Sequence, residues 1–232
     1  MRKMREGNGL MVPGTSIRTD HVRIDPKLIA RFSATPSAIL SDNLARLLGD
    51  GGALRLVTAA KHMAGTAFTV RTRPNDNLFV HKALDLVQPG DVLVVDAGGD
   101  VTHATMGEIM LEIAISKRVG GIVIDGAIRD IEAFQVNGMP VFAKGTSHRG
   151  PYKDGPGEIG CDVKIGEMVV HPGDLVVGDA DGLIAVRPSE LDALIVAAEA
   201  QMAREAGVIA SIKNGTVDRA WVDKTLKERG YI

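Results

Sequence analysis

The segment from Gly98 to Glu132 constrains the fold of this chain most, because glycine turns divide it into a helix and a buried strand. It reads GGDVTHATMGEIMLEIAISKRVGGIVIDGAIRDIE. Apolar side chains recur in it at helical spacing, which predicts a helix from about Thr105 to Lys117 with one apolar face. The residues of that face are Met106, Ile109, Met110, Ile113 and Ala114.

A glycine pair at 120–121 ends the predicted helix, and the all-apolar run at 122–124 is typical of a short buried strand. The Asp-Gly pair at 125–126 is predicted to end this strand. Arg129 and Asp130 follow on the turn beyond it. The segment therefore places two charged side chains just past the end of a strand.

This order of elements gives a physical reason to expect a site for an anion and a metal ion. The first turn of the helix, Gly107–Met110, has unpaired backbone N–H groups and the positive end of the helix dipole. Gly107 lets a carboxylate ligand approach the backbone closely. Arg129 can pair with the ligand, and Asp130 offers a hard oxygen to a divalent cation. A surface Arg-Asp turn beside an ordinary capped helix is the alternative, and spacing alone does not separate the two.

Composition limits the remaining choices. A chain of 232 residues with 45% hydrophobic and 24% charged residues is long enough for one sizeable globular domain. Its formal net charge of −2 gives no electrostatic footprint for nucleic acid or an anionic membrane. No apolar run reaches about 18 residues, so no membrane span is expected. The single cysteine, Cys161, excludes an intrachain disulfide framework and suits a reducing cytoplasm.

Periodicity elsewhere predicts an α/β fold with a mixed sheet. The chain divides into an N-terminal arm at 1–20, an α/β domain at 21–187 and C-terminal helices at 188–232. Ser41, Asp42 and His81 fall on predicted helices, where solvated polar positions and a structural histidine are the expected roles. The predicted helices are 26–32, one from Thr35-Pro36 to Gly49, 77–84, one from Pro188 and one around 217–229, and the predicted strands are 63–70, 92–95 and 140–143.

Two segments echo each other, QPGDVLVVDAGGD at 88–100 and HPGDLVVGDADGL at 171–183. Each is a Pro-Gly-Asp turn that leads into a β-branched strand. Repeated turn-and-strand chemistry explains the likeness without a gene duplication.

Several motifs together resemble a known family. GEIM followed by GGIVIDGAIRD is similar to the signature of the regulator of ribonuclease activity A family. It also resembles the related class II 4-hydroxy-4-methyl-2-oxoglutarate / 4-carboxy-4-hydroxy-2-oxoadipate aldolases. TPSAILSDNL, MAGTAFTVRTRPNDNL, VQPGDVLVVD and HPGDLVVGDADGLIAVRP fit in the same order. The resemblance covers roughly Thr35 to Pro188 and implies a swivelling β/β/α sandwich with a C-terminal helical arm.

The resemblance also implies a metal-dependent retro-aldol reaction on a 2-oxo acid. Mg²⁺ or Mn²⁺ would be held by Asp130 and several waters. Arg129 would pair with the keto oxygen and carboxylate of the substrate and stabilise a pyruvate enolate. The N–H groups of Gly107, Glu108, Ile109 and Met110 would hold the carboxylate, and Glu108 would orient a water that takes the proton from the C4 hydroxyl.

The resembling aldolases form trimers or pairs of trimers whose sites lie at subunit boundaries. The resemblance therefore implies a homotrimer or homohexamer in which the C-terminal helices pack on a neighbouring subunit. An acidic residue is donated across the boundary, and Glu205 is our candidate for it, with Glu199 as the alternative. A solvated carboxylate on a helix face is the simpler account of both residues.

Two rival functions stay open at the level of sequence. One is a non-catalytic regulator that binds ribonuclease E, although such a protein has no need of a metal ligand beside Arg129. The other is oxaloacetate decarboxylase activity, which the same enolate-stabilising site would serve. A methyltransferase label applied to some relatives is disfavoured, because no glycine-rich S-adenosylmethionine loop follows a first strand.

Overall fold

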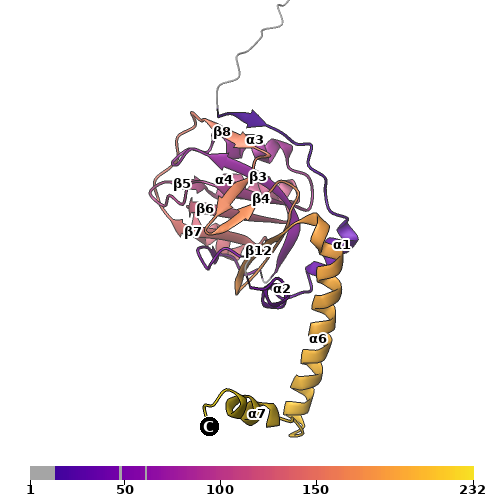
Figure 1. The fold of residues 1–232 in the computed structure, drawn as a ribbon. Coiled ribbons are helices and arrows are strands. Elements are labelled where there is room, and N and C mark those ends of the chain that lie inside the picture. The colour runs from indigo at the N-terminus through magenta and orange to yellow at the C-terminus, as the bar shows by residue number, and fades with distance from the viewer. Residues whose placement is uncertain (1–13, 47–48, 61) are drawn as a thin grey trace, which may run out of the picture.

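A large mixed sheet forms the middle of the molecule, with helices on one face and a small hairpin on the other (Figure 1). The structure is a computed structural model that describes residues 14–46, 49–60 and 62–232. Within these residues the main path of the sheet runs β1-β8-β3-β4-β6-β7-β2. Its strands are β1 (Ser16–Ile17), β2 (Arg55–Leu56), β3 (Met63–Thr72), β4 (Asp91–Asp96), β5 (Ala104–Met106), β6 (Gly121–Ile128), β7 (Val141–Thr146), β8 (Gly157–Ile159), β11 (Leu175–Asp179) and β12 (Gly182–Val186).

The centre of the sheet is parallel, and most of the strands that flank it join antiparallel. β3, β4, β6 and β7 run parallel, whereas β2, β8 and β11 join antiparallel to their neighbours. A separate antiparallel pair, β9 (Val163–Ile165) and β10 (Met168–Val170), covers part of one face. The remaining elements are the helices α1 (Pro26–Phe32), α2 (Ser37–Asn43), α3 (Leu78–Leu86), α4 (Glu108–Ser116), α5 (Ile131–Val136), the 3-10 turn η1 (Pro188–Glu190), α6 (Leu191–Lys213) and α7 (Ala220–Glu228).

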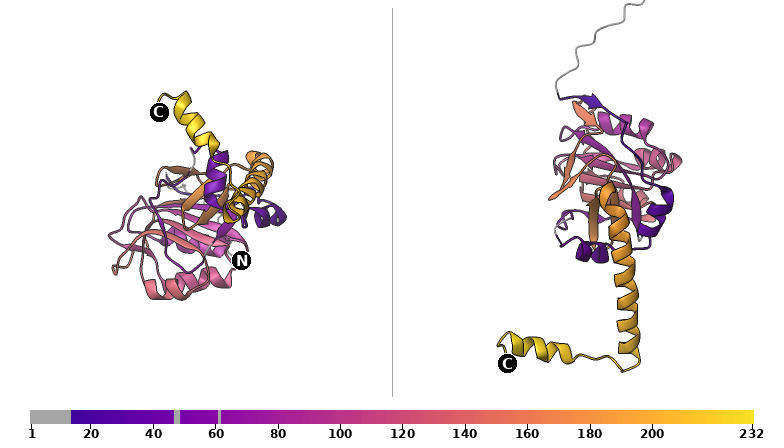
Figure 2. Two further views of the ribbon diagram at one scale, coloured as in Figure 1. Left: turned by 90° about the horizontal axis from the view of Figure 1, so that it is seen from below. Right: turned by 45° about the vertical axis from the view of Figure 1, so that its right-hand side comes forward.

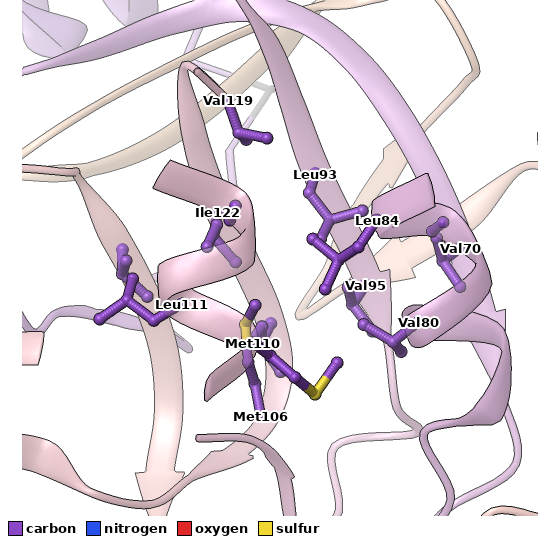
Figure 3. Close-up of a cluster of buried hydrophobic side chains, with 14 of the residues drawn as sticks. Val70, Val80, Leu84, Leu93, Val95, Met106, Met110, Leu111, Val119 and Ile122 are labelled. Carbon is purple, nitrogen blue, oxygen red and sulfur yellow. The ribbon is translucent and has the colours of Figure 1, made fainter. Parts of the chain in front are cut away.

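Alternating side chains of the central strands enter two different cores. On β4, Leu93 and Val95 pack with α3 and α4, whereas Val92 and Val94 pack toward β9 and β10. Successive side chains of a strand point to opposite faces, so a strand buried on both faces must be apolar throughout. Figure 3 shows the helix-side core, where residues from α3 and α4 meet those of β3, β4 and β6. This β/β/α layering confirms the predicted fold class.

A third core joins the C-terminal helix to the domain. Leu191, Leu194, Ile195 and Ala198 of α6 are buried with residues of α1, α2, β11 and β12. Met202 is the last α6 residue packed against this core, and the rest of α6 projects away from the domain with α7 at its far end (Figures 1 and 2). The predicted helix after Pro188 is therefore confirmed, and its first three turns pack on the domain.

Several element boundaries differ from the sequence prediction, three of them near the site or at the start of the domain. The helix expected from Thr105 begins at Glu108, because residues 104–106 pair as strand β5 with β6. The strand expected to end at Asp125 continues to Ile128. The helix expected to reach Gly49 is assigned only as far as Asn43, and residues 47–48 lie outside the described part of the chain.

The two Pro-Gly-Asp turns share one hydrogen-bond pattern. Asp91 Oδ2 accepts from the N–H of Gln88 at 2.8 Å, and Asp174 Oδ2 accepts from the N–H of His171 at 2.8 Å. Both aspartates are buried and each pairs with an arginine, Arg23 or Arg187. The likeness between the segments thus lies in turn chemistry, as the sequence suggested.

The first described residues lie along the sheet. β1 pairs in parallel with β8, so the end of the segment expected to be an N-terminal arm adds an edge strand; residues 1–13 lie outside the described part. Within the described ranges, no helix combines the length and apolar character needed to cross a membrane.

Candidate active site

Pairing between β5 and β6 brings the start of α4 beside the charged turn at 129–130. Ala104 and Met106 of β5 are in register with Ala127 and Ile128 of β6. The N–H of Arg129 donates to the carbonyl of Met106 at 3.0 Å. The glycine that caps α4 and the Arg-Asp turn therefore meet, although 22 residues separate Glu108 from Asp130.

Asp130 is held from two sides in an unusual backbone conformation. Its φ of +58° is left-handed, which a non-glycine residue adopts rarely and aspartate more readily than most. Its Oδ2 accepts a hydrogen bond from the N–H of Glu108 at 3.0 Å and lies 3.6 Å from Nε of Arg129. Both charged side chains remain 44% exposed, so each is oriented and still open to a ligand.

Gly107 is required by the close approach of this turn. A Cβ at position 107 would lie 2.6 Å from Oδ2 of Asp130 and 3.0 Å from Nε of Arg129. Real Cβ contacts are almost never that short, so any side chain here would displace one of the two charged groups. The glycine thus allows the helix terminus, the guanidinium and the carboxylate to share one small volume.

Two of the four N–H groups expected to bind a carboxylate are already bonded within the protein. The N–H of Glu108 donates to Asp130, and that of Met110 donates to the carbonyl of Gly107 at 3.1 Å. Among the described residues no partner is found for the N–H groups of Gly107 and Ile109. These two are the ones that an anion at the start of α4 can use.

Two cavities flank this turn. The smaller, of about 150 Å³, contains Arg129, Gly107, Ile109 and Met110 together with Asn77, His81 and Lys153. The wider, of about 630 Å³, is lined by Asp130, Glu108 and residues 131–136 of α5. Ile109, expected on the buried face of α4, is instead 75% exposed and lines the smaller cavity, so that part of the predicted apolar face was wrong.

Asn77, His81 and Lys153 were not predicted as site residues. Asn77 is 3% exposed; its Nδ2 donates to the carbonyl of Thr105 at 3.0 Å, but its Oδ1 has no partner. Burial and, second, the charge of Lys153 lower the pKa of His81. Asn77 and His81 are four residues apart and so lie on one helix face, and this spacing could have identified them as a pair of site residues. The loop around Lys153 has no periodicity that could have identified Lys153.

Comparison with known proteins places the chain in a family. The profile of the RraA-like family, described as Aldolase/RraA, matches residues 37–185, which include the whole of the site just described. The chain belongs to the RraA-like family.

Relatives in this RraA-like family have more than one role. A protein of Halalkalibacterium halodurans that carries the provisional name 4-hydroxy-4-methyl-2-oxoglutarate aldolase is 36% identical over 85% of this chain and 95% of its own. Streptomyces coelicolor RraAS2, described as an unusual member of the RNase ES inhibitor RraA protein family, is 28% identical with a TM-score of 0.73, over 80% of this chain and 96% of that one. The RNA-processing inhibitor RraA from Thermus thermophilis is 28% identical with a TM-score of 0.60, and the match covers 65% of this chain and 92% of that one. The first relative supports lyase activity of the aldolase type, and the others show that the family also includes regulators.

The donor set of this RraA-like site fits a cation held by one protein carboxylate. Asp130 uses Oδ2 for Glu108 and Arg129, and no hydrogen bond or ion pair is found for its Oδ1 among the described residues. The cavity beside it has room for the several waters that Mg²⁺ keeps when few protein ligands bind it. In the described part of the chain, no three His, Cys, Asp or Glu side chains gather as a metal-binding group. A site here would therefore depend on Asp130, water and ligand oxygens.

The two carboxylates considered as donors from the C-terminal helix have different surroundings. Glu199 is bonded to Arg31 through two contacts, at 2.8 Å and 2.7 Å, and this arginine lowers the pKa of the Glu199 carboxyl. Glu205 is exposed and accepts only from Gln201, at 2.9 Å, among the described residues. α6 leaves the domain away from α4 and β5, so one protomer does not bring Glu205 to its own site (Figure 1).

Proposed function

We propose that this protein is a divalent-metal-dependent class II pyruvate aldolase. It would cleave a 4-hydroxy-2-oxo acid of the 4-hydroxy-4-methyl-2-oxoglutarate or 4-carboxy-4-hydroxy-2-oxoadipate type into pyruvate and a second oxo acid. The observation that carries the proposal is the meeting of Arg129, Asp130 and the N-terminus of α4 at Gly107. The similarity to a provisionally named aldolase supports it.

The smaller cavity suits the pyruvate half of the substrate. Its carboxylate would accept hydrogen bonds from the N–H groups of Gly107 and Ile109, at the positive end of the α4 dipole. Arg129 would span that carboxylate and the keto oxygen, because a guanidinium presents several donors in one plane. Lys153 is then placed for a second carboxylate of the substrate, and the unpaired Oδ1 of Asn77 for a ligand hydroxyl.

Asp130 would hold the Mg²⁺ or Mn²⁺ ion. Such an ion, when bound, supplies Lewis acidity toward the oxygens of the 2-oxo acid. The protein's own contribution is to fix the Asp130 carboxylate, through Glu108 N–H, beside the guanidinium of Arg129.

Cleavage then requires one proton transfer and one charge-stabilising group. A water oriented by Glu108 takes the proton from the C4 hydroxyl, and the C4–O bond becomes a carbonyl as the C3–C4 bond breaks. The bonding electrons move to an enolate across C2 and C3, whose oxygen receives hydrogen bonds from Arg129. Protonation at C3 yields pyruvate. Oxaloacetate decarboxylation would produce the same enolate by loss of CO₂ and is a side activity of this proposal.

The proposed assembly is a homotrimer or homohexamer in which α6 of one subunit reaches the site of the next. Glu205 would be the donated carboxylate, because Glu199 is already committed to Arg31 within its own subunit. An acidic group there would assist the water that carries the C4 proton.

The second candidate function is a non-catalytic regulator of ribonuclease E. The observation in its favour is that solved relatives of similar fold are described as RNA-processing or RNase inhibitors. Against it, the match to the Thermus thermophilis inhibitor covers only 65% of this chain, so about a third of this chain has no counterpart there.

A pyruvate-release assay separates the two functions. Purified protein is incubated with each of the two 4-hydroxy-2-oxo acids and with oxaloacetate, with Mg²⁺, with Mn²⁺ or with excess EDTA. The aldolase proposal expects pyruvate release that EDTA abolishes and added metal restores. No release from any of the three acids would leave the regulator as the remaining function, and full release in EDTA would contradict the class II mechanism.

A further inference from the structure

Helix α7 is amphipathic, and no described part of its own chain buries it. Trp221, Val222 and Leu226 form its apolar side, while Lys224 and Lys227 lie on the other. No residue of α7 is buried, and Trp221 is 65% exposed. A nine-residue helix is marginal in water without tertiary packing, so this apolar side calls for a surface to cover it.

The arm that carries α7 projects away from its own domain (Figures 1 and 2). α6 is a continuous helix of 23 residues, and α7 lies beyond its free end, clear of the sheet in every view (Figures 1 and 2). Val208, Ile209 and Ile212 on the projecting part of α6 are also exposed. The arm therefore presents exposed apolar side chains to a second molecule.

The wide groove beside Asp130 has the complementary character. Its rim is acidic, from Glu108, Asp130 and Glu132, and its wall is apolar, from Ile131, Ala133 and Val136. Val136 is 87% exposed, although it is a large aliphatic residue. By contrast, residues 219–229 contain four basic residues and two acidic ones around Trp221. The apolar side of α7 matches the apolar wall, and Arg219 and Arg229, which cap the two ends of α7, are opposite in charge to the acidic rim.

We infer that α7 of a second copy of this chain docks in the groove between the start of α4 and α5, with Trp221 against Val136. The bond of Glu108 to Asp130 forms one wall of that groove, so the docked helix shields the Asp130 carboxylate from bulk water. This inference rests on the proposed assembly and adds which two surfaces meet. It does not depend on the aldol chemistry.

Trp221 is the single tryptophan of the chain, so its fluorescence reports on α7 alone. The full-length protein is measured without substrate, by emission wavelength and by quenching with acrylamide. Val136→Asp places a charge in the groove at an exposed position, where the fold has little reason to change. Val169→Asp, at an exposed valine of β10, is the matched control. Circular dichroism checks that both variants are folded.

The wild type and the control are expected to show blue-shifted emission and protection from acrylamide, and Val136→Asp to show solvated emission. Mixing Val136→Asp with Trp221→Phe, whose groove is intact and whose emission is silent, should restore the blue shift. Solvated emission from the wild type, or shielding that Val136→Asp leaves unchanged, would overturn the inference. Failure of the mixture to recover the blue-shifted emission would also overturn the inference, because the contact of Trp221 would then lie within one chain. A trimer with solvated Trp221 would leave the proposed assembly standing and remove only this contact.

Discussion

The backbone N–H of Glu108 donates to Oδ2 of Asp130 at 3.0 Å, and this bond ties the proposed metal ligand to the first turn of α4. A carboxylate at a helix N-terminus is stabilised by the unpaired N–H groups and the helix dipole. The same bond leaves Oδ1 of Asp130 for other ligands. Orientation of the carboxylate thus comes from the protein backbone and does not require an ion.

Asp130→Asn should raise the metal requirement and preserve the fold. Asparagine tolerates the left-handed backbone at this position and keeps an oxygen acceptor for Glu108, but it lacks the negative charge. The Mg²⁺ concentration for half-maximal pyruvate release should rise at least about tenfold, the lower end of what loss of even an outer-sphere partner costs. Mg²⁺ titrations of pyruvate release by the wild type and by Asp130→Asn measure this concentration. Identical titration curves would remove Asp130 from the metal site.

Gly107→Ala should slow turnover with little effect on the melting temperature. The new Cβ would lie 2.6 Å from Asp130 Oδ2, so the carboxylate or the guanidinium of Arg129 must move. Gly138→Ala is the control, since nothing lies within 4 Å of a Cβ there. A displacement of about 1 Å at a reacting group can cost about a hundredfold in rate. Equal kcat values for the two variants would mean that the close approach at Gly107 has no catalytic role.

Arg129→Lys tests the guanidinium itself. Lysine keeps the positive charge but loses the planar fork that can span two oxygens. If Arg129 stabilises the enolate, kcat should fall at least about a hundredfold, as when one preorganised oxyanion donor is removed. Arg118→Lys, at an exposed helix end, should behave as the wild type. Melting temperatures should change little, because Arg129 is on an exposed turn.

His81 should make the protein less stable in acid. Its pKa is lowered in the folded state, so below the ordinary value of 6.5 the unfolded chain binds a proton that the folded chain does not. Stability is therefore lost as the pH falls through 6.5, and the loss ends once the folded-state pKa is reached. His81→Gln should lose less stability than the wild type between about pH 7.5 and about pH 5.5 in urea unfolding. His148→Gln, an exposed control, should match the wild type.

Local patterns in the sequence were sufficient for most of the helices and for the long central strands, whereas short strands that pair with distant segments were missed. Glycine breakers and helical periodicity predicted α4 and β6 because both signals act over a few residues. The start of α4 was misplaced because Met106 fits the helical pattern, yet β5 pairs with β6 about 22 residues later. Hydrophobicity also misassigned Ile109, whose side chain lies exposed at the smaller cavity beside Arg129 and not in the core.

The same distinction holds for the candidate site. Arg129 and Asp130 were identified by their place after a buried strand and by motif resemblance, and the structure brings both to Gly107. Lys153 reaches the cavity from an irregular loop that tertiary folding positions, so no spacing rule could have placed it there. Asn77 follows a buried aspartate turn, and its unpaired Oδ1 is apparent only once its surroundings are known.

Subunit mixing tests whether Glu205 acts in the site of a neighbour. Glu205→Gln should lower kcat and leave folding unchanged, because Glu205 is exposed and its one bond among the described residues of its chain is to Gln201. Glu199→Gln should retain activity and lose only its pairing with Arg31. Arg129→Lys and Glu205→Gln proteins should each be slow alone but recover activity when mixed, since about a quarter of randomly assembled shared sites would contain both native residues. Light scattering should show a trimer or hexamer throughout. No recovery in a mixture that forms hybrid oligomers would place Glu205 outside the site, and full activity of a monomer would remove the shared site altogether.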